Sequence, residues 1–94
     1  MPVRSLRLGH DEHMITVTLY TKTGCGLCDE VKHSLLHLQP RFPHQLQEVD
    51  ITKDEGLFQQ YRYTIPVVQI GDVELAAPIT AVQLQTALQT ASST

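Results

Sequence analysis

The stretch MITVTLYTKTGCGLCDEVKHSLLHLQ, residues 14–39, decides the fold. Its opening part, Met14–Tyr20, alternates apolar and polar side chains and is rich in β-branched residues, which predicts a strand. Thr21–Gly24 predicts a loop, and Gly26–Gln39 predicts an amphipathic helix because leucine and valine recur every three or four residues. The sequence thus predicts a strand that leads directly into a helix, with a pair of cysteines at the junction. The expected apolar face of the helix comprises Leu27, Val31, Leu35 and Leu38.

A second strand and a short helix are predicted next. Pro40 and Pro43 end the first helix, and Gln45–Ile51 predicts the strand. Thr52 and Glu55 have the spacing of a capping box, in which a hydroxyl and a carboxylate bind backbone N–H groups at the start of a helix. The short helix that this box opens is expected to turn inward Leu57, Phe58 and Tyr61.

The C-terminal part predicts a hairpin and a last helix. Thr64–Pro66 interrupts the short helix, and two short strands follow, Val67–Ile70 and Val73–Ala76. Only Gly71 and Asp72 separate them, which indicates a two-residue hairpin turn. A second capping box, Thr80 with Gln83, opens a helix that is expected to bury Ala81, Leu84, Leu88 and Ala91.

The predicted order of elements is β-α-β-α-β-β-α, which defines an α/β fold. The crossover helix makes the first two strands parallel with a right-handed connection, and the hairpin makes the last two antiparallel. We therefore expect a four-stranded mixed sheet flanked by helices. The domain is predicted to span residues 14–94, after a flexible N-terminal leader over residues 1–13.

Composition excludes several classes of protein. The 94 residues, 41% hydrophobic and 18% charged, fit one small globular domain. A net charge of −3 argues against nucleic-acid binding through a basic surface. No apolar run is long enough to span a membrane, and the first 13 residues lack the apolar stretch of a secretory signal. We expect a cytoplasmic monomer, and in that reducing compartment a Cys-x-x-Cys pair is more often redox-active or metal-binding than a structural disulfide.

Cys25 and Cys28 are the only cysteines of the chain. Disulfide exchange requires a thiolate, and a free thiol with a pKa of about 8.5 is mostly protonated at neutral pH. Unpaired N–H groups and the dipole at the start of the helix favour the anion. Lys22 adds a positive charge three residues before Cys25. Each effect contributes on the order of 1 kcal/mol, or about one pKa unit or less.

Position at the junction predicts a separate role for each cysteine. Cys25 precedes the helix, is expected to be the more exposed thiol, and is therefore the candidate nucleophile. Cys28 lies in the first turn, is expected to be more buried, and would attack the mixed disulfide on Cys25. Gly26 leaves room for a partner to approach, and Leu27 offers it an apolar contact.

A structural zinc site is the alternative for this pair, because two cysteines at this spacing can form half of one. His33 and His37 share a helix face that is expected to point away from the cysteines. His10 and His13 belong to the leader and do not discriminate between the alternatives. We expect no metal at the site.

These features together resemble the glutaredoxin branch of the thioredoxin superfamily, from about Ile15 to Ala91. The resemblance rests on LYTKTGCGLC at residues 19–28, VDI at 49–51 and TIPVV at 64–68. It implies a thioredoxin-like fold in which Pro66 follows a cis peptide bond beside the cysteine pair. It also implies that the backbone of Ile65 binds an extended peptide or glutathione, that Cys25 is the nucleophile, and that Lys22 is the lysine found just before it.

The chain departs from the glutaredoxin pattern at two places. Gly26-Leu27 stands where Pro-Tyr is usual between the cysteines, and Ala76–Thr80 replaces a paired-glycine turn and acidic residues that help to hold glutathione. Thr80 still offers its hydroxyl and N–H to a carboxylate, although a plain helix cap is the favoured interpretation. Arg62 can also meet a glutathione carboxylate, and a solvated arginine is the favoured interpretation there.

The resemblance implies a thiol–disulfide oxidoreductase that reduces protein disulfides or glutathione mixed disulfides. Its expected partners are disulfide-containing or glutathionylated proteins and an electron donor, either glutathione or a donor of the thioredoxin-reductase type. No tightly bound cofactor is expected. The alternative is a non-enzymatic thioredoxin-like module, such as an iron–sulfur carrier or a redox-sensing adaptor, because some relatives hold a cluster between two chains and Gly26 leaves room for one.

Overall fold

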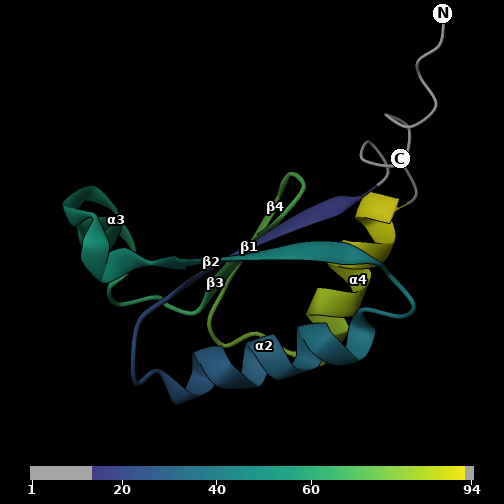
Figure 1. Cartoon of the computed structure of the whole chain (residues 1–94), viewed down its shortest axis with the longest axis horizontal. Coiled ribbons are helices and arrows are strands. Elements are labelled where there is room, and N and C mark those ends of the chain that lie inside the picture. The colour runs from purple at the N-terminus through teal and green to yellow at the C-terminus, as the bar shows by residue number, and fades with distance from the viewer. Residues whose placement is uncertain (1–13, 93–94) are drawn as a thin grey trace, which may run out of the picture.

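A computed structural model describes residues 14–92 of the chain (Figure 1). The predicted order of strands and helices is confirmed, with one added 3₁₀ helix, η1. The leader predicted over residues 1–13 lies outside the described residues. The elements are β1 (Ile15–Thr21), α2 (Gly26–Leu38), β2 (His44–Asp50), η1 (Ile51–Lys53), α3 (Glu55–Tyr61), β3 (Val67–Ile70), β4 (Val73–Ala76) and α4 (Ala81–Ser92).

The four strands form one mixed sheet in the order β2-β1-β3-β4. β1 and β2 are parallel, with Tyr20 opposite Val49, and β1 pairs with β3 in the antiparallel sense, with Tyr20 opposite Val67. β3 and β4 form the predicted hairpin, and Gly71 at its turn has a φ of +58°, a conformation that glycine adopts without steric cost. The predicted thioredoxin-like α/β fold is therefore confirmed.

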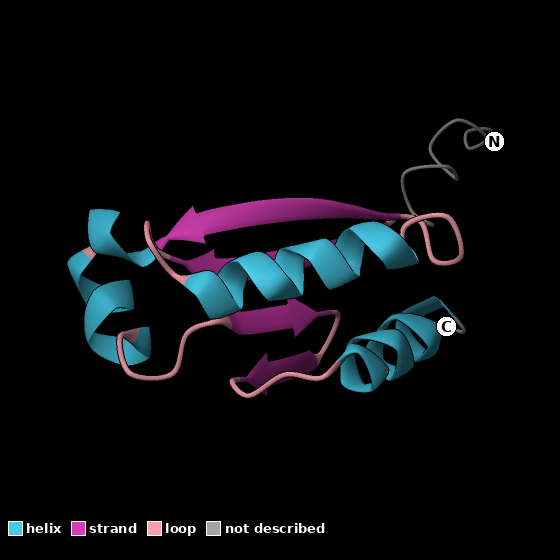
Figure 2. Cartoon of the chain, turned by 90° about the horizontal axis from the view of Figure 1, so that it is seen from below, coloured by secondary structure: helices cyan, strands magenta, loops and turns pink. Residues whose placement is uncertain are grey.

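The main core lies between one face of the sheet and the helices α2 and α4, which Figure 2 shows side by side in front of the strands. Alternate residues of each strand point into it because successive side chains of a strand face opposite sides. The fully packed members are Val17, Leu19, Val31, Leu35, Leu38, Val68, Ile70, Leu84, Ala87 and Leu88. None of the helices in the described part combines the length and the apolar character that crossing a bilayer would need.

The opposite face of the sheet carries a smaller cluster beneath α3. Ile51, Tyr61 and Val67 are buried there, and the predicted inward positions Leu57 and Phe58 pack against them. The ring of Tyr61 stacks on that of Tyr20 with 4.5 Å between the ring centroids. This cluster fixes α3 near the end of the sheet at which β1 leads into the loop before Cys25.

The helix faces differ from the prediction at three positions, namely Leu27, Ala81 and Ala87. Leu27 is 55% exposed, whereas Cys28 is 2% exposed and begins the buried stripe of α2 in its place. Ala81 of α4 is exposed, and Ala87 is buried instead. The sequence pattern does not decide these positions, because neighbouring residues such as Leu27 and Cys28 both lie close to the apolar face and tertiary packing selects the one that is covered.

The capping box predicted at Thr52 and Glu55 is wrong. Thr52 lies in η1 and donates from its N and Oγ1 to Oδ1 of Asp50, bonds that hold the pKa of Asp50 below its usual range. Asp54 caps α3 instead, since its Oδ1 accepts from the Leu57 N–H at 3.0 Å. An aspartate two residues later competed successfully for the same role.

β2 also begins one residue earlier than predicted and ends at Asp50. The N–H of His44 donates to Oε1 of Gln39 at 2.6 Å, and its Nδ1 lies 2.7 Å from the carbonyl oxygen of Phe42. These bonds satisfy a buried polar residue at the start of the strand, which sequence periodicity does not predict.

The second predicted capping box is confirmed. Gln83 N donates to Oγ1 of Thr80 at 3.1 Å, and Thr80 N donates to Oε1 of Gln83 at 2.8 Å. The two bonds satisfy donors at the start of α4 reciprocally.

Asp54→Ala should lower the free energy of unfolding by about 1 kcal/mol, because it removes the cap of α3. Glu55→Ala is the matched control, since it removes a carboxylate from the same turn without removing that cap. Urea unfolding of both variants measures the difference. A larger loss of unfolding free energy in Glu55→Ala than in Asp54→Ala would contradict this assignment and support the predicted box of Thr52 and Glu55.

Tyr61→Phe should make stability less sensitive to alkaline pH. Burial, with Glu74 and Tyr20 nearby, raises the pKa of Tyr61 above its ordinary value. Neutral Tyr61 therefore contributes stability that is present in full below about pH 10 and is lost as the pH rises through the folded-state pKa. Urea unfolding from pH 9 to pH 11 measures this slope, with Tyr63→Phe as the exposed control. Equal slopes in all three proteins would contradict the assignment.

Candidate functional site

One end of the sheet brings together segments that are far apart in the sequence. Tyr20 near the end of β1 lies opposite Val67 at the start of β3, which lies opposite Ala76 at the end of β4. The loop after β1, the segment before β3 and the segment after β4 therefore meet at this end, as Figure 2 shows. The predicted residues Cys25, Pro66 and Thr80 lie on these three segments.

The cysteines are joined in a disulfide at the start of α2. Gly24, with a φ of +84°, turns the chain out of the loop, and Cys25 occupies the N-cap position. The Sγ of Cys25 accepts a hydrogen bond from the backbone N of Cys28 at 3.2 Å. The first cysteine thus fills the place that a serine or aspartate cap would take, so its sulfur lies against N–H groups that favour negative charge.

The two sulfur-bearing residues differ in exposure, as predicted from their positions. Cys28 is 2% exposed and faces the core, whereas Cys25 is partly exposed. Gly26 has open space where a Cβ would stand, and Leu27 projects outward. A partner can therefore reach Cys25 from solvent, and Cys28 is protected from direct contact with it.

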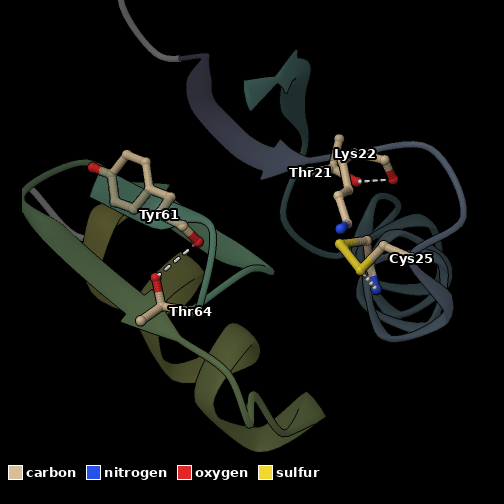
Figure 3. Close-up of a disulfide and its surroundings, with 6 residues drawn as sticks. Thr21, Lys22, Cys25, Tyr61 and Thr64 are labelled. Carbon is tan, nitrogen blue, oxygen red and sulfur yellow. Dashed lines mark hydrogen bonds between the residues drawn. A yellow bond between two sulfur atoms is a disulfide. The ribbon is translucent and has the colours of Figure 1, made fainter. Parts of the chain in front are cut away.

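Lys22 lies in the loop between β1 and α2. In the view of Figure 3 its side chain extends toward the disulfide. Oγ1 of the preceding Thr21 donates to the Lys22 carbonyl oxygen at 3.5 Å. The electrostatic role of Lys22 remains a prediction.

The Ile65–Pro66 peptide bond is cis, which is the geometry that the resemblance implied. The carbonyl oxygen of Pro66 accepts from Ala77 N at 3.0 Å, so the start of β3 is tied to the segment after β4. Ala77–Pro78 is a second cis bond that the sequence analysis did not predict. The binding roles expected for Ile65 and Pro66 remain predictions.

Tyr61 and Gln83 hold two of the predicted site residues, Ile65 and Thr80, in place. The Tyr61 carbonyl oxygen accepts from Thr64 N at 2.9 Å and from Ile65 N at 3.1 Å. It also accepts from Thr64 Oγ1 at 3.3 Å (Figure 3). The Oε1 of Gln83 accepts from Thr80 N at 2.8 Å and from Thr80 Oγ1 at 3.3 Å. The Thr80–Gln83 spacing predicted the second contact, whereas no residue pattern predicts the contacts that the backbone carbonyl of Tyr61 makes.

Metal ligands are sparse around the disulfide. Within residues 14–92, no three His, Cys, Asp or Glu side chains lie close enough together to hold a metal ion. His33 and His37 contact each other edge to face, with ring centroids 5.1 Å apart, on an exposed face of α2. His10 and His13 lie outside the described residues.

Comparison with known proteins agrees with this geometry. The family model described as Glutaredoxin-like domain (DUF836) matches residues 16–90. The solved structure of protein XcR50 from X. campestris has a TM-score of 0.67 and 31% identity, over 79% of this chain and 96% of that one. Protein Ne2328 from Nitrosomonas europaea has a TM-score of 0.67 and 24% identity, over 92% and 96% of the two chains. Oxidised thioredoxin O2 from Arabidopsis thaliana shares the fold. It is 21% identical, with a TM-score of 0.64 over 85% of this chain and 76% of that one.

The reduced Cys28→Ser protein should react with iodoacetamide at Cys25 with a midpoint pH below about 8.5, the value for a free thiol. Lys22→Met in that background should raise the midpoint by about half a unit, because an exposed charge is screened by solvent. Arg41→Met is the control, since it removes a positive charge near the far end of α2. A midpoint at or above that of free cysteine would refute the electrostatic account.

Proposed function

The chain belongs to the glutaredoxin-like domain family, and we propose that it is a thiol–disulfide oxidoreductase acting through Cys25 and Cys28. One observation carries the proposal. The sulfur of Cys25 caps α2 and accepts the Cys28 N–H at 3.2 Å, while Cys28 itself is buried. This arrangement supports an accessible thiolate with a second thiol held beside it.

The first step is attack on a substrate disulfide, R–S–S–R′. The Cys25 thiolate forms a bond to one substrate sulfur, the substrate S–S bond breaks, and R′–S⁻ leaves and takes a proton from water. The product is a mixed disulfide between Cys25 and R. In this step the N–H of Cys28 serves to stabilise the attacking anion, because hydrogen bonds to a charged acceptor are stronger than those to a neutral one.

The second step releases the substrate. The Cys28 sulfur attacks the Sγ of Cys25, R–S⁻ departs, and the proton of the Cys28 thiol is transferred to the departing thiolate. Two electrons have then passed from the protein dithiol to the substrate disulfide. The Cα atoms of the cysteines lie 5.2 Å apart in the disulfide, so the resolving step needs no large movement of α2.

Regeneration requires an external reductant. Two molecules of glutathione, or one dithiol donor of the thioredoxin-reductase type, would return the disulfide to the dithiol form with two electrons. We propose disulfide-containing or glutathionylated proteins as substrates, a monomer as the working form, and the reducing cytoplasm as the compartment in which such a cycle runs. Ile65 and Pro66, on the segment before β3, are proposed to line the substrate-binding side of the disulfide.

Cys28→Ser should trap the first step. After reduction and incubation with oxidised glutathione or with a disulfide-bonded protein, mass spectrometry should find an adduct on Cys25, because no second thiol can release it. Wild-type protein should carry the Cys25–Cys28 disulfide instead, and Cys25→Ser should carry no adduct on Cys28 because that residue is buried. An adduct on Cys28 alone would reverse the proposed roles.

A further inference from the structure

We propose that the site takes an extended apolar segment around a protein disulfide, and that it does not favour the anionic tripeptide glutathione. The inference rests on the oxidoreductase function proposed above and names its substrate class. Two sets of observations carry it. Hydrogen-bond donors that would receive the carboxylates of glutathione are already engaged within the chain, and exposed apolar side chains stand where a partner must approach.

The hydrogen-bond donors of Thr80, the residue just before α4, are bound by a side chain from the first turn of that helix. Thr80 donates from N and from Oγ1 to Oε1 of Gln83, at 2.8 Å and 3.3 Å. A carboxylate could bind these donors only by displacing the Gln83 oxygen. The N–H and the hydroxyl of Thr80, which could otherwise bind a carboxylate, are therefore already bound by the Gln83 side chain.

The Arg62 side chain at the end of α3 is engaged as well. The guanidinium of Arg62 lies 4.7 Å from the centroid of the Tyr63 ring and 5.6 Å from that of Phe58. These contacts hold the cation against aromatic faces and lower what it would gain from a glutathione carboxylate.

Two large side chains are exposed next to this end of the sheet, one in the first turn of α2 and one on the segment before β3. Leu27 lies between the cysteines and is 55% exposed, and Tyr63, three residues before Pro66, is 85% exposed. A protein segment that lays its own apolar side chains against them would remove this surface from water, which favours binding. Glutathione has no large apolar side chain with which to do so.

Two mixed disulfides with the same leaving group test the proposal. One joins thionitrobenzoate to glutathione, and the other joins it to the uncharged peptide acetyl-Val-Cys-Leu-amide. Stopped-flow absorbance measures the rate at which the reduced Cys28→Ser protein releases thionitrobenzoate from each. Division by the rate with free dithiothreitol removes the intrinsic reactivity of each probe. The peptide should react about tenfold faster than the glutathione probe after this correction, the order of effect expected from burying one large apolar side chain.

Variants identify the groups responsible for that preference. Leu27→Ser and Tyr63→Ser should each lower the ratio of the two corrected rates by about threefold or more, because each removes apolar contact area. Leu36→Ser is the matched control, since Leu36 is 60% exposed on the same helix outside the site, and it should leave both rates unchanged. Gln83→Ala should lower the ratio by raising the rate with the glutathione probe. α4 keeps a cap in that variant because Thr80 Oγ1 still accepts from the backbone of residue 83.

The outcomes separate this inference from the function on which it rests. Equal corrected rates, or a faster rate with the glutathione probe, would overturn the substrate class while leaving the oxidoreductase function in place. Failure of both probes to react faster than they do with a Cys25→Ser, Cys28→Ser double variant would overturn the function itself. A ratio that Leu36→Ser lowers as much as Leu27→Ser would also contradict the inference, because the apolar contact would then not be local to the cysteines.

Discussion

The hydrogen bond from the Cys28 backbone N–H to the Cys25 sulfur is the interaction on which the rest of the site depends. It exists because Cys25 is the N-cap of α2, where backbone donors have no partner within the helix. Most caps are oxygen atoms that only stabilise a helix. Here the capping atom is also the reacting atom, so the start of α2 both stabilises the helix and favours the charge that disulfide exchange requires.

The sheet keeps that junction in place. β1 lies in the middle of the order β2-β1-β3-β4, and α2 is held against it by Val31 and Leu35, which are almost fully buried. The antiparallel pairing of β1 with β3 brings the segment containing Pro66 to the same end of the sheet at which β1 leads into the loop before Cys25. Because a domain of this size has a small core, each buried side chain makes up a large part of it. The side chain of Cys28 is one of these buried residues.

Much of this architecture could be predicted from the sequence, because hydrophobic periodicity and turn residues are local signals. The strand order along the chain, the hairpin at Gly71 and the cap at Thr80 depend on neighbours in sequence and were predicted correctly. The errors lie where two local signals compete or where tertiary cover ends. Asp54 displaced Thr52 as a cap, and packing buries Cys28 while it leaves the neighbouring Leu27 exposed, although both lie close to the apolar face of α2. For the site, the cysteine pair was evident, whereas the engagement of Ile65 N by the Tyr61 carbonyl depends on how α3 ends and has no sequence signature.

The most direct test of the central claim is an electron count under anaerobic conditions. Fully reduced protein, freed of reductant, is mixed with a limiting amount of a protein that carries one accessible disulfide, and both are quenched with acid and alkylated. The account predicts one mole of Cys25–Cys28 disulfide formed for each mole of substrate dithiol, with no other modified residue. A substrate that stays oxidised while Cys25 and Cys28 stay reduced would contradict it.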